Sequence, residues 1–365
     1  MGTLRILLAL WVAAAHGRSF AGPEAGSPWV AVQCAFIISG FYMSLVLNEK
    51  YTGPGSLGRF LSQRLWRLFP GFWAVLLLTL AAGGAAWGWW GGSFPPLDLW
   101  RNHHLRMDGA AKGLLAAANG LLVGTNEAYF LGFDPTGRSL RWTAHLGASD
   151  LPAWPFLALP QAWAIELALL FSIAAPWIVR RSLAMVGALL LASLAVRLVC
   201  TFGFQLTFDP WTHRFFPSEL AFFLLGSIAY KIYRAPWRER AAEGLWVWPL
   251  FALLFAATIA FPFIPLSSHL KAWAYYGLAT VTLPFLFAET KNWRWDRWLG
   301  ELSYPVYLIH FLVIWIGQAA LPASAHARLG GWAVLGSLAA SIALHHGLLA
   351  PIKTWRTRRT RPSLA

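Results

Sequence analysis

With 365 residues, 58% of them hydrophobic and only 12% charged, the chain is too apolar for a pair of soluble domains and is typical of a polytopic membrane protein. Its net charge of +14 does not indicate nucleic-acid binding, because most of the 29 Lys and Arg residues lie in short loops between apolar segments, where the positive-inside rule explains them. The two cysteines, Cys34 and Cys200, fall within apolar segments and give neither a disulfide framework nor metal-ligand spacing.

Ten apolar segments are predicted to be transmembrane helices. They cover approximately residues 3–20, 29–48, 70–90, 158–179, 183–202, 216–233, 245–262, 271–289, 302–321 and 331–352. When both ends of the chain are placed in the cytoplasm, the basic loops lie inside and the short outer loops carry almost no charge. We therefore expect an all-α membrane protein with one domain over residues 1–355 and a basic cytoplasmic tail over 356–365.

The first of these helices is apolar except for Arg5 near its start and His16 eleven residues later. Eleven residues make about three turns of an α-helix, so the two side chains share a face and lie about 16 Å apart along the axis. A titratable base at that depth is costly, which makes it a functional candidate. Taken alone, the segment also fits a signal peptide, or a histidine bonded to a neighbouring helix.

The next polar features are a small-residue notch and a pair of arginines. Ser39-Gly40 in the second segment suits a close helix contact as well as a ligand. Arg64 and Arg67, three residues apart before Pro70, point the same way on a helix, and guanidinium groups so placed suit phosphate oxygens. Ordinary positive-inside charge or lipid headgroup binding explains the same arginines equally simply.

The connection over residues 91–157 is the only long one. It contains one weakly apolar piece, Gly113–Gly124, in which Gly residues and Asn119 argue against a full span. Counting a span there would also invert the charge bias of every later loop. We expect this piece to be a re-entrant or interfacial helix, within an outer loop that covers an outward-facing cavity.

Glu166 is the next candidate, about 9 Å inside the outer end of the fourth segment by the helical rise. A carboxylate at that depth needs a partner. His16 approaches the same depth from the inner side, so an imidazole–carboxylate pair is one interpretation. A structural ion pair with Arg18 or Arg197 is the other.

The ninth and tenth segments supply the remaining polar groups. Ser303, Tyr307 and His310 are spaced by four and three residues and so form one polar stripe, with Tyr304 beside it. His345 and His346 are adjacent and point about 100° apart, which makes them a poor metal pair. We therefore expect no metal site and interpret these two histidines as packing or cavity lining.

Together these motifs resemble membrane-bound acyltransferase family 3, the family of bacterial O-antigen and exopolysaccharide O-acetylases. The matching features, in chain order, are Arg5 with His16, Phe36 to Phe41, Arg64 and Arg67 before Pro70, Trp163 with Glu166, Phe223 to Gly226, and Leu299 to His310. No single one of these motifs is specific to the family, and the resemblance depends on the whole set in this order. Two departures are that Gly2 stands where the family often has an acidic residue, and that Gln161 to Ile165 replace a Ser-rich approach to the glutamate.

The resemblance implies transfer of an acyl group, most simply acetyl, from cytoplasmic acyl-CoA to a hydroxyl of a cell-envelope glycan or lipid-linked sugar, across the bacterial inner membrane. It implies catalytic roles for His16 as the base and Glu166 as the acid that orients it. It implies CoA phosphate contacts for Arg5, Arg64 and Arg67. A second tier of residues is expected along the substrate path: Ser39, Tyr304, Tyr307 and His310.

Two other classes of function stay open from the sequence. A transporter or flippase of a lipid-linked sugar would use the same intramembrane charges as a relay. Against it, the two halves of the chain show no evident repeat, and the inner arginine cluster has no obvious use. The third class is a structural subunit of a polysaccharide assembly complex with an inactive site, and the retained Arg5, His16 and Glu166 argue against it. The bilayer is the one partner that all three readings share, and the oligomeric state is open.

Overall fold

The computed structural model describes residues 1–17, 28–89, 93–145, 149–238, 246–322 and 329–360. In chain order its α-helices are α1 (Gly2–His16), α2 (Pro28–Glu49), α3 (Ser56–Trp89), α4 (Pro95–His103), α5 (Gly109–Leu121), α6 (Trp163–Ile178), α7 (Leu183–Leu198), α8 (Phe216–Tyr233), α10 (Val247–Ala260), α11 (Ser268–Thr290), α12 (Arg294–Ala320), α13 (Leu329–Leu344) and α14 (Ala350–Thr360). Short 3-10 or π segments are η1 (Glu127–Phe130), η3 (Trp154–Phe156), η4 (Pro160–Ala162), η5 (Val199–Gly203), η6 (Phe261–Phe263) and η8 (His345–Leu349).

The predominance of apolar helices confirms the expected class, an all-α membrane protein. A helix occupies each of the ten predicted segments, and in the described part of the chain six helices are long and apolar enough to cross a membrane. These six are Pro28–Glu49, Ser56–Gly88, Pro160–Ile178, Leu183–Gly203, Arg294–Ala320 and Leu329–Arg358. The number of ten crossings therefore stays a prediction.

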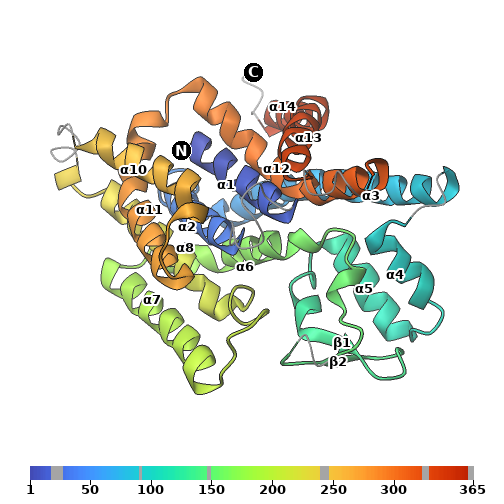
Figure 1. The fold of residues 1–365 in the computed structure, drawn as a ribbon. Coiled ribbons are helices and arrows are strands. Elements are labelled where there is room, and N and C mark those ends of the chain that lie inside the picture. Colours follow the sequence, from blue (N-terminus) through green and yellow to red (C-terminus); the bar gives the residue numbers. More distant parts are fainter. Residues whose placement is uncertain (18–27, 90–92, 146–148, 239–245, 323–328, 361–365) are drawn as a thin grey trace.

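The first helix lies inside the bundle. α1 packs against α2, α12 and α13, and Figure 1 shows it next to α12. It is apolar almost all round, and Leu4, Leu8 and Val12 are buried, as expected for a helix surrounded by others. This packing makes α1 a component of the core.

The predicted notch at Ser39-Gly40 is a helix contact between α2 and α8. A Cβ atom at Gly40 would lie 2.0 Å from the carbonyl oxygen of Phe223, and one at Gly226 would lie 1.9 Å from that of Ile37. Only glycine therefore permits the two backbones to approach this closely. Helix packing, the simpler of the two interpretations, explains Gly40.

The third helix begins earlier than predicted. α3 runs without a break from Ser56 to Trp89 with Pro70 inside it, whereas the sequence suggested a span that starts at residue 70. Arg64 and Arg67 are therefore part of a long helix. A proline inside an apolar helix is tolerated because neighbouring groups can satisfy the backbone positions that it frees.

The long connection folds into a small unit with strands that the sequence did not predict. The predicted helix is present as α5, and the side chain of Asp108 caps its start by accepting from the N–H of Ala111 at 2.7 Å. β1 (Leu131–Phe133) and β2 (Leu140–Trp142) form an antiparallel hairpin. This unit, residues 93–145 and 149–160, lies with α4 and α5 below α3 in Figure 1 and has its own apolar core around Leu115 and Phe156.

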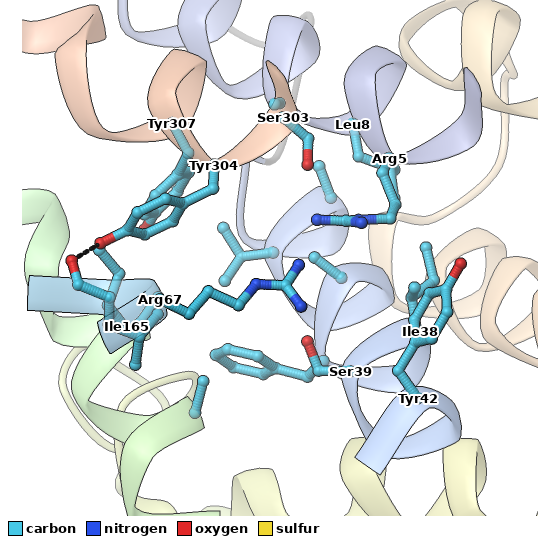
Figure 2. A pocket seen from close by; sticks show the side chains of 18 of the residues that line it. Arg5, Leu8, Ile38, Ser39, Tyr42, Arg67, Ile165, Ser303, Tyr304 and Tyr307 are labelled. Carbon is cyan, nitrogen blue, oxygen red and sulfur yellow. Dashed lines mark hydrogen bonds between the residues drawn. The ribbon is translucent and has the colours of Figure 1, made fainter. Parts of the chain in front are cut away.

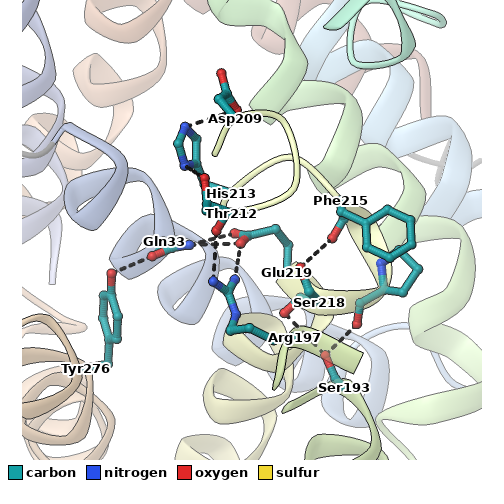
Figure 3. Close-up of polar contacts among 11 residues, drawn as sticks. Gln33, Ser193, Arg197, Asp209, Thr212, His213, Phe215, Ser218, Glu219 and Tyr276 are labelled. Atoms are coloured by element: carbon teal, nitrogen blue, oxygen red, sulfur yellow. Dashed lines mark hydrogen bonds and ion pairs between the residues drawn. The ribbon is translucent and has the colours of Figure 1, made fainter. Parts of the chain in front are cut away.

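A buried polar cluster connects four helices (Figure 3). Glu219 of α8 accepts hydrogen bonds from Gln33 of α2, at 2.8 and 3.1 Å, and from Arg197 of α7. Tyr276 of α11 donates to the Oε1 atom of Gln33 at 2.5 Å. The arginine compensates the buried carboxylate, which would otherwise be very costly to bury. Arg197 is thus paired with Glu219, so the alternative pairing of Arg197 with Glu166 is wrong.

Candidate active site

Two adjoining cavities lie around the N-terminal half of α1. One, the apolar cavity, has a volume of about 180 Å³ and is walled mainly by hydrophobic side chains of α1, α2, α6 and α12. The other, the basic cavity, has a volume of about 520 Å³ and is rich in Lys and Arg. Four residues line both cavities and form what we call the neck: Arg5, Tyr42, Arg67 and Tyr304.

The three arginines that were predicted to contact CoA phosphates, Arg5, Arg64 and Arg67, all line the apolar cavity. Figure 2 shows the guanidinium groups of Arg5 and Arg67 extending into the cavity from opposite sides, and Arg64 lines the apolar cavity on the same helix as Arg67. Their contacts are with aromatic rings: Arg5 lies 5.9 Å from the ring of Tyr42 and Arg64 lies 5.2 Å from that of Phe60.

No hydrogen bond or ion pair to any of these three guanidinium groups occurs among the residues that the structure describes. All three guanidinium groups line the apolar cavity, whose described lining includes no carboxylate, so they repel one another, and an anion between them removes that repulsion. Arginine is also the side chain best suited to phosphate oxygens, because its planar fork binds two at once. The neck therefore has the charge and the donors of an anion site.

Three of the four second-tier residues line the apolar cavity: Ser39, Tyr304 and Tyr307. Both tyrosine hydroxyls are occupied, since Tyr304 donates to the carbonyl of Leu68 at 2.5 Å and Tyr307 donates to that of Gln161 at 2.8 Å. These bonds tie α12 to α3 and to η4. The two rings are thus fixed as walls of the cavity.

The predicted channel from Arg5 to His16 is found only in part. Leu8, Ala9 and Val12 of α1 line the apolar cavity above Arg5, but His16, one turn further along, lines neither cavity. His16 is exposed at the end of the helix. The cavity therefore ends about 6 Å along the helix axis before the predicted base.

His16 nevertheless has the arrangement of a neutral base. Its Nδ1 atom lies 2.9 Å from the carbonyl oxygen of Val12, so Nδ1 carries the proton and the lone pair is at Nε2. Its ring centroid lies 4.7 Å from that of Phe311 and 5.2 Å from that of His310. These two rings of α12 fix the orientation of the imidazole.

His310 is placed behind His16, which corrects its predicted position along the substrate path. It is fully buried and lines neither cavity. Its Nδ1 atom donates to the carbonyl of Tyr307 at 2.6 Å, and its Nε2 atom has no hydrogen-bond partner within the described residues. His310 therefore lies next to His16, in the position where the sequence led us to expect Glu166.

Glu166 does not contact His16, and the predicted imidazole–carboxylate pair is wrong. One carboxylate oxygen accepts from the N–H of Gly124 at 2.8 Å, and the other accepts from the hydroxyl of Thr125 and the N–H of Asn126, both at 2.7 Å. The turn that follows α5 directs these donors at the start of α6. Glu166 thus fastens the small unit of the long connection to the helix bundle.

Replacing Glu166 with Ala is expected to destabilise the protein, because the hydroxyl of Thr125 and the N–H of Asn126, both buried, and the half-buried N–H of Gly124 lose their acceptor. Each buried group left unpaired costs about 1–3 kcal/mol. Thermal unfolding of the purified protein measures this, with the exposed Glu289 of α11 as a control for loss of a carboxylate. An unchanged unfolding midpoint together with lost transfer would instead support a catalytic role for Glu166.

The neighbouring Glu127, in η1, is expected to make the stability of the folded protein depend on pH. Burial, followed by the charge of Glu166, raises its pKa from 4.5 to about 7. The folded protein therefore holds this proton more tightly than the unfolded chain, so stability is lost as the pH rises from about 4.5 to about 7. Glu127→Gln is expected to remove this loss. Unfolding midpoints measured at pH 5 and pH 8 test it, and an equal decrease in both proteins would contradict it.

Asp296 is a functional-site residue that the sequence did not reveal. Its carboxylate accepts from the backbone N–H groups of Gly2 and Thr3 and from the hydroxyl of Thr3, each at 2.8 Å, and forms an ion pair with the amino group of Met1 at 2.9 Å. A carboxylate at a helix N-terminus satisfies unpaired donors and the helix dipole. Asp296 thereby fixes the position of α1 and of Arg5 one turn later.

This contact also accounts for the departure at Gly2. A Cβ atom there would lie 1.6 Å from the backbone oxygen of Asp296, so an acidic side chain cannot be accommodated at position 2. The carboxylate comes from α12 instead. No local pattern indicates such a cap, because the two residues are 294 positions apart.

Comparison with known proteins gives one match. The family model described as an acyltransferase domain matches residues 2–346, nearly the whole chain. The match includes every residue of the apolar cavity and ends before α14, which forms part of the wall of the basic cavity. No curated protein and no solved structure matches the chain.

Proposed function

The chain belongs to acyltransferase family 3, and we propose that it transfers a short acyl group, most simply acetyl, from acyl-CoA to a hydroxyl of a cell-envelope glycan. The observation that carries the proposal is the neck, where the unpaired guanidinium groups of Arg5 and Arg67 stand between a basic and an apolar cavity. A long molecule that is anionic at one end and uncharged at the other fits this pair of cavities. Acyl-CoA is such a molecule.

The negative charge of the CoA phosphates determines how the donor is oriented in the two cavities. The CoA phosphates are too costly to transfer into apolar surroundings, so they stay with Arg5 and Arg67 at the neck and with Arg64 one turn before Arg67 on α3. Only the uncharged pantetheine arm and the thioester need pass into the apolar cavity.

His16 is the group that removes the proton from the acceptor. As the hydroxyl oxygen attacks the thioester carbon, Nε2 takes its proton, while the Nδ1–H bond to Val12 holds the ring. The carbon–sulfur bond then breaks, and the proton passes to the leaving sulfur to give free CoA and the ester. Because the apolar cavity ends near Val12 and Tyr307, the acyl end must extend one further turn to meet His16.

The same arrangement supports an orientation in the membrane. The basic cavity is lined by residues next to the α2–α3 and α11–α12 connections and by α14, which are the basic segments assigned to the cytoplasm. His16 lies at the other end of α1, beside His310 and Phe311 of α12. We therefore place both ends of the chain in the cytoplasm of a bacterial inner membrane, with the acceptor entering from outside.

Release of free thiol from acetyl-CoA by the protein in liposomes, with and without an added glycan, tests the proposal. We expect thiol release from the wild type that increases with glycan and is absent in His16→Ala. Absence of thiol release from the wild type with acetyl-CoA and longer acyl-CoA donors would contradict acyl transfer. Movement of a lipid-linked sugar across the bilayer under the same conditions would then indicate a transporter.

A further inference from the structure

The basic cavity is larger than the neck requires, and its far wall carries cations of its own. We propose that this wall binds the 3′-phosphate of the CoA donor through Arg297 of α12 and Arg356 of α14. The proposal rests on the proposed function, because it assigns the far end of the same donor.

The location of the 3′-phosphate site follows from the residues that line the basic cavity but not the apolar cavity. Arg5 and Arg67 line both, so they hold the phosphates nearest the pantetheine arm, which are those of the diphosphate. Five cationic residues line the basic cavity alone: Lys50, Lys291, Arg297, Lys353 and Arg356. In CoA the ribose and its 3′-phosphate follow the diphosphate, on the side away from the thioester. A donor whose thioester enters the neck therefore places its 3′-phosphate among these residues.

The carboxylates of the basic cavity cancel only part of this charge. Asp296 is bound to the first residues of α1. Glu301 accepts from Lys353 and lies 3.6 Å from Nε2 of His345. Arg297 is exposed, and its side chain has no hydrogen bond or ion pair among the described residues. The wall thus keeps an excess of positive charge that a phosphate dianion would match.

The cavity also offers a surface for the base next to that phosphate. The indole of Trp66 lines it and is 46% exposed, and its ring lies 6.2 Å from that of Trp355 on α14. A flat, accessible aromatic face suits the stacking of an adenine ring. α14, which contributes Arg356, lies beyond residue 346, where the family match ends. This part of the donor site is thus carried by a segment outside the matched domain.

The proposal is tested by binding of CoA and 3′-dephospho-CoA to the purified full-length protein. We expect the wild type to bind CoA at least about tenfold more tightly, because charge-assisted hydrogen bonds to a phosphate are worth roughly 1.5–3 kcal/mol. In Arg297→Gln and Arg356→Gln the affinity for CoA should fall toward that for dephospho-CoA. The affinity for dephospho-CoA itself should not change.

Matched controls are available on the same helices. Arg294 lies in the same first turn of α12 as Arg297, and Arg358 lies two residues after Arg356; both are exposed and neither lines the basic cavity. Arg294→Gln and Arg358→Gln should leave the preference for CoA intact. Equal wild-type affinities for the two ligands, or equal effects of the control and test variants, would overturn the 3′-phosphate site while leaving acyl transfer standing. Failure of the wild type to bind either ligand would overturn both proposals.

Discussion

Replacing His16 with Ala is expected to reduce acyl transfer by about 10² to 10⁴-fold while donor binding stays nearly unchanged. The reason is that general base catalysis is worth roughly this factor, and the imidazole lines neither cavity in which the donor would lie. Transfer measured as thiol release, together with acyl-CoA binding to the same preparation, separates the two effects.

The exposed His104 is the matched control for this experiment. Its Nδ1 atom lies 2.8 Å from the carbonyl oxygen of Trp100, four residues earlier, which is the same local geometry that His16 has with Val12. His104→Ala is expected to keep full activity. Wild-type rates in His16→Ala would remove the histidine from the reaction, and weakened acyl-CoA binding in that variant would assign it to the donor site instead.

Replacing Arg67 with Ala is expected to weaken acyl-CoA binding by about ten- to a hundredfold, because each charge-assisted contact to phosphate contributes roughly 1.5–3 kcal/mol. Arg5→Ala should have a similar effect, since both guanidinium groups face the neck (Figure 2). The loss should appear mainly in the Michaelis constant for the donor, with a smaller effect on the maximal rate. Binding of acetyl-pantetheine, which has no phosphate, should not change.

Arg59 provides the comparison on the same helix. It is exposed near the start of α3, outside both cavities, and its side chain donates to the carbonyl of Pro54 at 3.3 Å. Arg59→Ala should bind acyl-CoA as the wild type does. If Arg59→Ala and Arg67→Ala weaken binding equally, the effect is one of general surface charge, and the neck has no special role.

Features that depend on short-range periodicity were predictable from the sequence. Because α1 is a regular helix, the eleven-residue spacing places Arg5 at the neck and His16 beyond the far end of the apolar cavity. Arg64 and Arg67 were expected to point together, and both line the apolar cavity. Helical spacing alone determines these relations, whatever surrounds the helices.

Features that depend on contacts between distant segments were not predictable. Depth in the membrane suggested a partner for Glu166, but the donors that its carboxylate accepts from belong to a turn whose position is set by the small unit around α5. Asp296 gives no local signal of its role, because the helix that it caps begins at the other end of the sequence. The cluster of Gln33, Arg197 and Glu219 likewise combines residues from three separate helices.

The cap at Asp296 has a consequence for biosynthesis. Arg5 is synthesised before α12, yet the carboxylate that fixes its helix, and the ring of Tyr304 that completes the neck, belong to α12. A chain without α12 would contain His16 and both neck arginines, Arg5 and Arg67, but would lack Tyr304 and the Asp296 carboxylate that complete the site. Assembly of the neck therefore waits for α12, and under the proposed function a chain that lacks α12 would have no complete site for the acyl donor.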